Sequence, residues 1–192
     1  FPTNQWHADQ VVEDIREIEV WPGTPPGFYQ IEIVLYEPRN NRWLKPDNSH
    51  DLLVAPVQIP KASAPEVLDM DHPLETHLGG RVKLLGYNLE GSFRPGDNIH
   101  LTLFWQATTR MDEGYTTFVH LTDGAGRIWG QKDNEPVDGF YPTTEWEVGE
   151  IVRDQYDVLI PMETPPGEYQ LEVGMYLAES GERLPIASQK GD

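Results

Sequence analysis

The stretch that decides the fold is residues 141–184, YPTTEWEVGEIVRDQYDVLIPMETPPGEYQLEVGMYLAESGERL, because closely similar text stands at residues 1–44, FPTNQWHADQVVEDIREIEVWPGTPPGFYQIEIVLYEPRNNRWL. At a constant offset of 140 and without gaps, 14 of the 44 positions are identical. The identities are spread along the whole length, which chance does not produce in segments of ordinary composition. The chain therefore carries one structural unit twice, as a first repeat (1–44) and a second repeat (141–184).

The opening part of the first repeat alternates between apolar and polar residues. Over residues 11–20, Val12, Ile18 and Val20 share one face and glutamates occupy the other. This is the period of a half-buried strand. A turn is expected over residues 21–27, because prolines fix the backbone and donate no hydrogen bond to a ladder.

Further strands are expected in the rest of the first sixty residues. Residues 29–36 alternate again, a short strand is expected around Trp43, and residues 51–59 form the last alternating run. After residue 60 the periodicity stops, with a short helical turn allowed after Pro65. The predicted domains are a partial module over 1–60, a linker over 61–76 and a complete or nearly complete module over 77–192.

The second module shows the same kind of pattern. Short alternating runs are separated by Pro/Gly turns at roughly 8- to 12-residue spacing, which is typical of a β-sandwich. The expected strands and turns are a strand over 82–87, a turn over 94–97, a strand over 99–106, a strand over 115–122, and a hairpin turn over 123–126 leading into 127–131. Trp105 is expected in the core.

These patterns predict an all-β chain. The fold class is an immunoglobulin-like (fibronectin III-like) antiparallel β-sandwich, present as one complete or nearly complete module plus a partial copy. The Pro-Pro-Gly-x-Tyr text before Tyr29 and Tyr169 resembles a tyrosine corner, in which the phenol bonds backbone upstream. Half a sandwich leaves open strand edges. Self-association through these incomplete edges is therefore one hypothesis for the partner.

Composition excludes several classes of function. The chain has 14 basic and 32 acidic residues, a formal net charge of -18, which opposes binding to nucleic acid or an anionic lipid surface. It has no cysteine, so no disulfide, thiolate metal site or thiol nucleophile exists. No apolar run approaches the ~20 residues of a membrane span, so this segment is not expected to insert into a membrane.

The second module resembles a β-sandwich repeat in the extracytoplasmic C-terminal regions of bacterial membrane glycosyltransferases of the dolichyl-phosphate-mannose protein mannosyltransferase type. The residues that carry the resemblance are His72-Pro73-Leu74, Leu84-Leu85-Gly86-Tyr87, Arg94-Pro95-Gly96-Asp97, Leu101 to Ala107, Phe118-Val119-His120-Leu121, Tyr141-Pro142-Thr143-Thr144, Gly149-Glu150-Ile151-Val152 and Pro165-Pro166-Gly167 through Pro185. The resemblance implies an extracytoplasmic or cell-surface location, tethered through a parent membrane protein. It implies no catalysis, because sugar transfer is attributed to the membrane-embedded part.

Aromatic residues suggest a carbohydrate-binding site. Sugars stack their flat C–H faces on aromatic rings while carboxylates and amides take the hydroxyls. The candidates are Trp129, Tyr141, Gln131 and Asp133, together with Trp21 and Trp43, which each occur in only one repeat. The alternative is that these tryptophans cover a sheet or fill a protein interface.

Two oxygen-rich clusters are candidates for calcium, although no other cofactor is expected. The candidate ligands are Asp69 and Asp71 in the linker, and Asp133, Asn134 and Glu135 after the hairpin. Pro73 and the absence of a glycine at the sixth position argue against an EF-hand. The alternative is a hydrated linker or turn. His120, within a strand, is expected to be a structural histidine rather than a ligand.

No catalytic motif is present. A nucleophile elbow, a zinc-protease helix, a phosphate loop and a dinucleotide fingerprint are all absent from the sequence. The chain is therefore expected to be a non-enzymatic accessory region of a membrane glycosyltransferase-like or other surface protein, with glycan contact as one hypothesis. The alternative is a structural subunit of a surface fibre or swapped oligomer, completed in trans. A carbohydrate-active enzyme using paired carboxylates ranks third.

Overall fold

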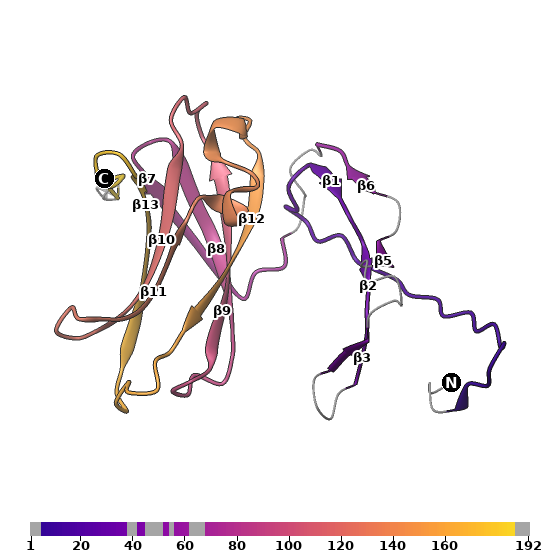
Figure 1. Cartoon of the computed structure of the whole chain (residues 1–192). Coiled ribbons are helices and arrows are strands. Elements are labelled where there is room, and N and C mark those ends of the chain that lie inside the picture. Colours follow the sequence, from indigo (N-terminus) through magenta and orange to yellow (C-terminus); the bar gives the residue numbers. More distant parts are fainter. Residues whose placement is uncertain (1–4, 38–41, 45–51, 54–55, 62–67, 187–192) are drawn as a thin grey trace.

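The computed structural model describes residues 5–37, 42–44, 52–53, 56–61 and 68–186. The fold is all-β, as predicted, and its strands pair antiparallel. No helix among these residues is long and apolar enough to cross a membrane. Figure 1 shows a two-sheet sandwich on one side and a smaller region of short strands, β1 to β6, beside strand β12.

The sandwich consists of a four-stranded and a three-stranded sheet, and we call it the complete module (72–186). The first sheet has the order β12-β9-β8-β7, with β12 Ile151–Leu159, β9 Asn98–Ala107, β8 Val82–Glu90 and β7 His72–Leu78. The second has the order β11-β10-β13, with β11 Ile128–Asn134, β10 Tyr115–Asp123 and β13 Tyr169–Leu177. Two short 3-10 turns, η2 Pro136–Gly139 and η3 Thr143–Glu145, connect β11 to β12.

The pairing of non-consecutive strands agrees with the predicted immunoglobulin-like arrangement. In that arrangement strand B pairs with E, and C pairs with F. Here β9 pairs with β12 and β10 pairs with β13, so these strands take the places of B, E, C and F. β8 takes the place of A, and β7 is an additional edge strand beside it.

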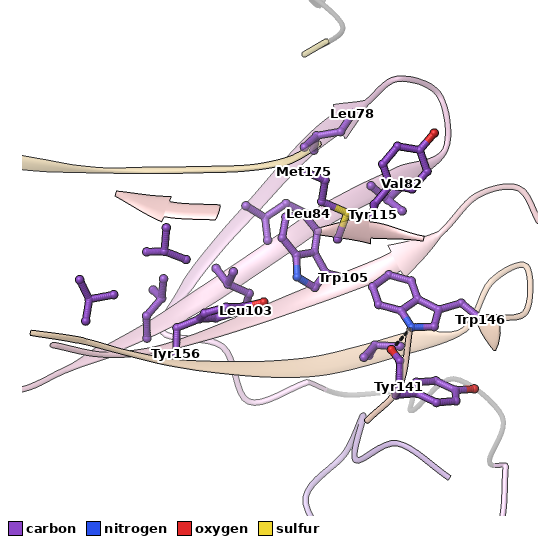
Figure 2. Packing of buried hydrophobic residues seen from close by; sticks show 14 of the residues in the cluster. Leu78, Val82, Leu84, Leu103, Trp105, Tyr115, Tyr141, Trp146, Tyr156 and Met175 are labelled. Carbon is purple, nitrogen blue, oxygen red and sulfur yellow. Dashed lines mark hydrogen bonds between the residues drawn. The ribbon is translucent and has the colours of Figure 1, made fainter. Parts of the chain in front are cut away.

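Large aromatic and aliphatic side chains fill the space between the two sheets (Figure 2). Trp105, predicted to be in the core, is completely buried on β9. Trp146 is buried behind it and donates its indole N–H to the carbonyl oxygen of Tyr141 at 3.0 Å, the dashed line in Figure 2. The alternating runs recognised in the sequence thus bury their apolar faces on one another, which is the main stabilising contribution to a sandwich.

The described residues of the first repeat, and those that follow it up to residue 61, form short strands. They are β1 Gly27–Tyr29, β2 Glu32–Ile33, β3 Leu35–Glu37, β4 Arg42–Leu44, β5 Leu52–Leu53 and β6 Val57–Ile59. These strands pair two by two, as β1 with β6, β2 with β5, and β3 with β4.

Local structure is preserved between the two repeats. Tyr29 donates its hydroxyl to the carbonyl of Pro25 at 2.7 Å, and Tyr169 donates to the carbonyl of Pro165 at 2.6 Å. Both predicted tyrosine corners are therefore confirmed, and the one in the complete module lies at the start of the F-like strand β13, its expected place. The β3–β4 hairpin also recurs, because Tyr176 bridges to Arg183 as Tyr36 pairs with Trp43.

The strand predicted over residues 11–20 is wrong, since these residues have no regular secondary structure and most are exposed. Their counterpart in the second repeat is β12, which forms its whole ladder with β9. Among the described residues of the first repeat there is no counterpart of β9. Alternation therefore gave the segment the capacity to be a strand, but a strand also needs a partner for its backbone groups.

The boundary predicted for the second module is five residues late. The expected linker over 61–76 overlaps β7, which begins at His72 and pairs with β8. Pro73 lies within β7, which is an edge strand, where a proline is tolerated. The register shift between Pro73 and Thr76 accommodates the irregularity. The helical turn considered after Pro65 falls outside the described residues.

Candidate functional site

A cluster of polar side chains in the complete module lies on the side of the β11-β10-β13 sheet that faces away from the core. We call it the outer face. Because β10 is the central strand, its outward side chains Phe118 and His120 are flanked on both sides. In register, His120 lies opposite Gln131 on β11 and Glu172 on β13. Directly opposite side chains point to the same face of a sheet, so these groups converge.

Asp133 holds this cluster together. One carboxylate oxygen lies 3.1 Å from Nε2 of His120, and the other accepts the hydroxyl of Tyr176 at 3.4 Å. The His120 side chain is only 8% exposed and that of Asp133 26%. Burial, followed by the neighbouring Asp133 carboxylate, raises the pKa of the Tyr176 hydroxyl. Asp133 therefore remains partly open to solvent while fixing two side chains from other strands.

Phe118 provides the apolar floor of the outer face. Its ring lies over Gly174, where a Cβ atom would come within 2.6 Å of the ring, and the guanidinium carbon of Arg183 lies 4.3 Å from its centre. The first repeat has Val34 at the position of Gly174 and Trp43 at that of Arg183. This floor therefore belongs to the complete module alone.

His120 has one ring nitrogen engaged and one not. Nε2 faces Asp133, while Nδ1 is buried and has no hydrogen-bond partner among the described residues. A buried unpaired polar atom is uncommon and costly. The outer face thus brings carboxylates, an imidazole, a phenol and a guanidinium together around the ring of Phe118.

Of the predicted carbohydrate-binding residues, Gln131 and Asp133 lie on this face but Trp129 serves another purpose. The Trp129 indole N–H donates to Asp123 at 2.9 Å, which is the largest cause of the lowered pKa of that carboxyl group. The Arg127 guanidinium lies 4.0 Å from the Trp129 ring centre, and Tyr169 meets the ring edge-on. Trp129 therefore closes the hairpin end of the sandwich with its ring covered.

Tyr141 lies far from Trp129. Trp129 bonds Asp123 at the end of β10, whereas Thr143, two residues after Tyr141, accepts the backbone N–H of Tyr115 at the beginning of β10. The strand has nine residues, so its ends are eight residues apart, roughly 27 Å at a strand's rise. Tyr141 is buried and donates to Glu150 at 2.9 Å, and burial raises the pKa of its hydroxyl. The structure therefore does not bring the two rings together.

The predicted calcium ligands do not converge. The side-chain amide of Asn88 binds the backbone of the linker candidates, since it accepts from the N–H of Asp71 at 2.8 Å and donates to the carbonyl of Asp69 at 3.0 Å. In the other cluster, the Asn134 amide donates to the backbone carbonyl of Glu135 at 2.8 Å, and Asp133 faces His120. Within the described part of the chain, no group of three or more His, Asp or Glu side chains could hold a metal ion.

Trp21, another predicted glycan candidate, lies in a contact between the first repeat and the complete module. The guanidinium carbon of Arg153 on β12 lies 5.2 Å from its ring centre, and the Arg153 backbone N–H donates to the carbonyl of Gly23 at 2.8 Å. Nearby, Tyr29 packs against Phe140 with ring centres 5.8 Å apart. The turn of the first repeat thus covers part of the open edge of β12. The side chain of Trp43 lies outside the described residues.

Lys61 adds a polar contact between the same two parts. Its ammonium group lies 3.0 Å from the carboxylate of Glu147 and donates to the carbonyl of Glu145 at 3.3 Å. Both side chains of the ion pair are exposed, so the pair contributes little to stability. Specificity in this contact therefore rests on Trp21, Tyr29 and the backbone bond at Gly23.

Asp154, which is not among the predicted site residues, has a structural role in the complete module. This side chain is fully buried and accepts three hydrogen bonds, from Tyr156 Oη at 2.6 Å, the Val137 N–H at 2.8 Å and Trp105 Nε1 at 3.3 Å. Burial raises the pKa of Asp154 to about 6, opposed by these bonds, which favour the carboxylate. The sequence does contain a signal for this role. Asp154 lies on the same face of the alternating run as Val152 and Val158, where a charged residue is unexpected.

Comparison with known proteins adds no relative to this picture. No family model, curated protein or solved structure matches the chain.

Proposed function

We propose that the chain is a non-catalytic accessory region of an extracytoplasmic surface protein, such as a membrane glycosyltransferase, in which successive β-sandwich repeats are held in a fixed arrangement. The observation that carries the proposal is the contact of the first repeat with the edge of β12, through Trp21, Gly23 and Arg153. A contact of one repeat with the next module is what a spacer or scaffold built from tandem units requires.

The repeat itself supports this role. The turn that contacts β12 contains the Thr-Pro-Pro-Gly-x-Tyr text, and the second repeat carries the same text at residues 164–169. Its tyrosine corner has the same hydrogen bond, so the turn has the same local shape. A following unit could therefore contact the complete module in the same way, and the arrangement could continue along a longer array.

Replacing Arg153 by Ala is expected to loosen the first repeat without unfolding the complete module. The variant removes the guanidinium from the Trp21 ring, a contact of about 0.5–1 kcal/mol at an exposed site, and leaves the backbone bond to Gly23. The measurement is ¹⁵N relaxation of residues 27–37. Their apparent rotational correlation time should become shorter than that of the complete module.

Arg127→Ala is the matched control, because it removes an arginine from a tryptophan ring inside the complete module. It should leave the motion of residues 27–37 unchanged. If the two variants have the same effect, or if residues 27–37 already tumble independently in the wild type, the contact does not hold the repeats together and the proposal fails.

Glycan contact at the outer face is a second candidate function. The observation that favours it is the partly open Asp133 carboxylate between His120 and Tyr176, beside Nδ1 of His120, which has no partner in the described part of the chain. Carboxylate, phenol and imidazole groups are suitable partners for sugar hydroxyls, and a few convergent polar groups over an apolar floor are typical of small-molecule sites.

If this face contacts glycans, Asp133→Asn is expected to weaken binding of neutral oligosaccharides about tenfold, because a hydrogen bond to a charged group is lost. Isothermal titration against an oligosaccharide panel measures the change. Asp157→Asn, an exposed position on the other sheet, is the control and should bind as the wild type does. Absence of binding across the panel, or equal loss in both variants, would rule out this role.

A further inference from the structure

One edge of β13 is unpaired over half of its length. The other edge pairs with β10 along the whole strand. On the other side, the backbone N–H of Leu184 donates to the carbonyl of Met175 at 2.8 Å, and the N–H of Leu177 donates to the carbonyl of Glu182 at 3.0 Å. An isolated β-bridge also joins Tyr176 to Arg183. From residue 169 to residue 173, no described residue pairs with this side. We call residues 167–173 the acceptor edge.

An apolar gap runs beside the acceptor edge, between β13 and β8. Two cavities of about 530 and 370 Å³ line up along it and share Leu89, Tyr169 and Leu171. The first is also lined by Thr164, whose buried hydroxyl has no hydrogen-bond partner among the described residues. In an immunoglobulin-like sandwich this is the place of strand G, which pairs with strand F and fills the core behind it.

The first repeat shows which segment fits such an edge. There, Gly27, Phe28 and Tyr29 pair with Ile59, Gln58 and Val57, and β2 pairs with β5. At the offset of 140, β1 and β2 correspond to residues 167–169 and 172–173, which make up the acceptor edge. The chain therefore carries two short strands, β5 and β6, that pair with the equivalent edge in its own first repeat.

The side chains of this segment also match the gap. In antiparallel pairing, directly opposite residues point to the same face. Val57 is opposite Tyr29, so on the acceptor edge it would be opposite Tyr169, which lines both cavities. Ile59 and Val57 would then fill the gap, whereas Val57 is 41% exposed where it pairs with Tyr29 in the first repeat. Moving the segment to β13 buries apolar surface that is in water at its present place.

We propose that the acceptor edge binds β6, Val57–Ile59, of a second molecule of this chain, so that one molecule supplies a G-like strand to the next. The donor comes from another molecule because the first repeat contacts β12, at the opposite side of the sandwich from β13. β12 and β11 contact each other at one side, while β13 faces β7 and β8 across the gap at the other (Figure 1).

Each molecule has one donor segment and one acceptor edge, so the contact is heterologous. Such a contact closes into a ring if the rotation allows it and otherwise continues as a filament. Backbone hydrogen bonds supply affinity in strand addition of this kind, and alternate side chains supply register. The acceptor edge shares Glu172 with the outer face but includes neither Asp133 nor the Trp21 contact, so this assembly and the proposed accessory function are tested by different variants.

Light scattering of the full chain over a range of concentrations is the first test. The wild type is expected to rise above the monomer mass with concentration. Val57→Glu should keep the chain monomeric, because the carboxylate would enter the apolar gap. Gln58→Lys is the charged control, since this neighbouring side chain points away from the gap and would lie opposite Glu168, and it should assemble at least as well as the wild type does. A wild type that stays monomeric throughout, or equal losses in the two variants, would overturn the proposal.

Disulfide trapping identifies the occupant, since the chain has no cysteine of its own. Gln58 is opposite Phe28, whose counterpart is Glu168, so a mixture of Gln58→Cys and Glu168→Cys chains should give a mixed disulfide under mild oxidation. Gln58→Cys mixed with Gln155→Cys should give little mixed disulfide, because Gln155 is an exposed residue of β12 and lies outside the acceptor edge. Equal yields in the two mixtures would contradict the proposal. So would a chain carrying both Gln58→Cys and Glu168→Cys that closes its disulfide as a monomer, because its own segment would then occupy the edge.

Discussion

Asp154→Ala is expected to lower the free energy of unfolding of the complete module by about 3–5 kcal/mol, because it leaves three buried donors without an acceptor. The donors are the Val137 N–H, Trp105 Nε1 and the Tyr156 hydroxyl, which come from η2, β9 and β12. Trp105 and Tyr156 are buried and Val137 is half-buried, so water replaces few of the lost bonds. Urea unfolding followed by tryptophan fluorescence measures the change.

The control is Asp157→Ala on the same strand. Asp157 is exposed and lies 2.6 Å from Nδ1 of His100, an exposed pair of the kind that contributes about 1 kcal/mol or less. Equal losses in the two variants would contradict the special role of Asp154. Both variants remove one carboxylate from β12, but the Asp154 side chain is buried and the Asp157 side chain is exposed.

The difference in stability between the wild type and Asp154→Ala should depend on pH, because the pKa of Asp154 is raised in the folded state. An unfolded Asp titrates near 3.9 and the folded one at about 6. Between these values the folded state holds a proton that the unfolded state has released, so the contribution of Asp154 to stability falls as pH rises from about 4 to 6. The wild type should therefore exceed Asp154→Ala by about 3 kcal/mol more at pH 4 than at pH 7. Other acidic groups are present in both proteins and cancel in the difference.

Much of the sandwich could be predicted because its strands alternate over long runs. In β9, for example, Leu101, Leu103 and Trp105 share the buried face, and the sequence shows this period directly. The tyrosine corner could also be predicted, since a turn rich in proline before a tyrosine is a local signal. The tyrosine corner depends on residues close together in the sequence. The alternation of a strand is the same whichever partner buries its apolar face.

What could not be predicted depends on partners distant in the sequence. Residues 11–20 alternate as β12 does, but only β12 has β9 beside it, so only β12 is a strand. In the same way, Gln131 and Asp133 were placed with Trp129 because they are neighbours in sequence. Trp129 instead bonds Asp123 at the hairpin end, and Asp133 meets His120 and Tyr176 across the sheet. Cross-strand pairing decides such sites, and spacing along one strand does not.

Trp146→Ala is expected to cost about 3–5 kcal/mol of stability, and Trp6→Ala much less, although the two tryptophans occupy the same position in the two repeats. Trp146 is 1% exposed and its indole N–H is bonded to the Tyr141 carbonyl, so truncation leaves both a large cavity and an unpaired carbonyl. Trp6 is 39% exposed, and water can fill the space left by its ring. The measurement is urea unfolding of each variant, followed by far-UV circular dichroism.

The pair tests whether completeness of the surrounding sandwich, rather than the repeat sequence, determines what a residue contributes. Equal losses would mean that the first repeat buries Trp6 in a sandwich of its own in solution, as the second repeat buries Trp146. A large loss confined to Trp146→Ala would mean that a repeat stabilises its conserved tryptophan only when strands such as β9 and β10 cover it. Repeated text then specifies a unit that becomes a packed core only where its partner strands are present.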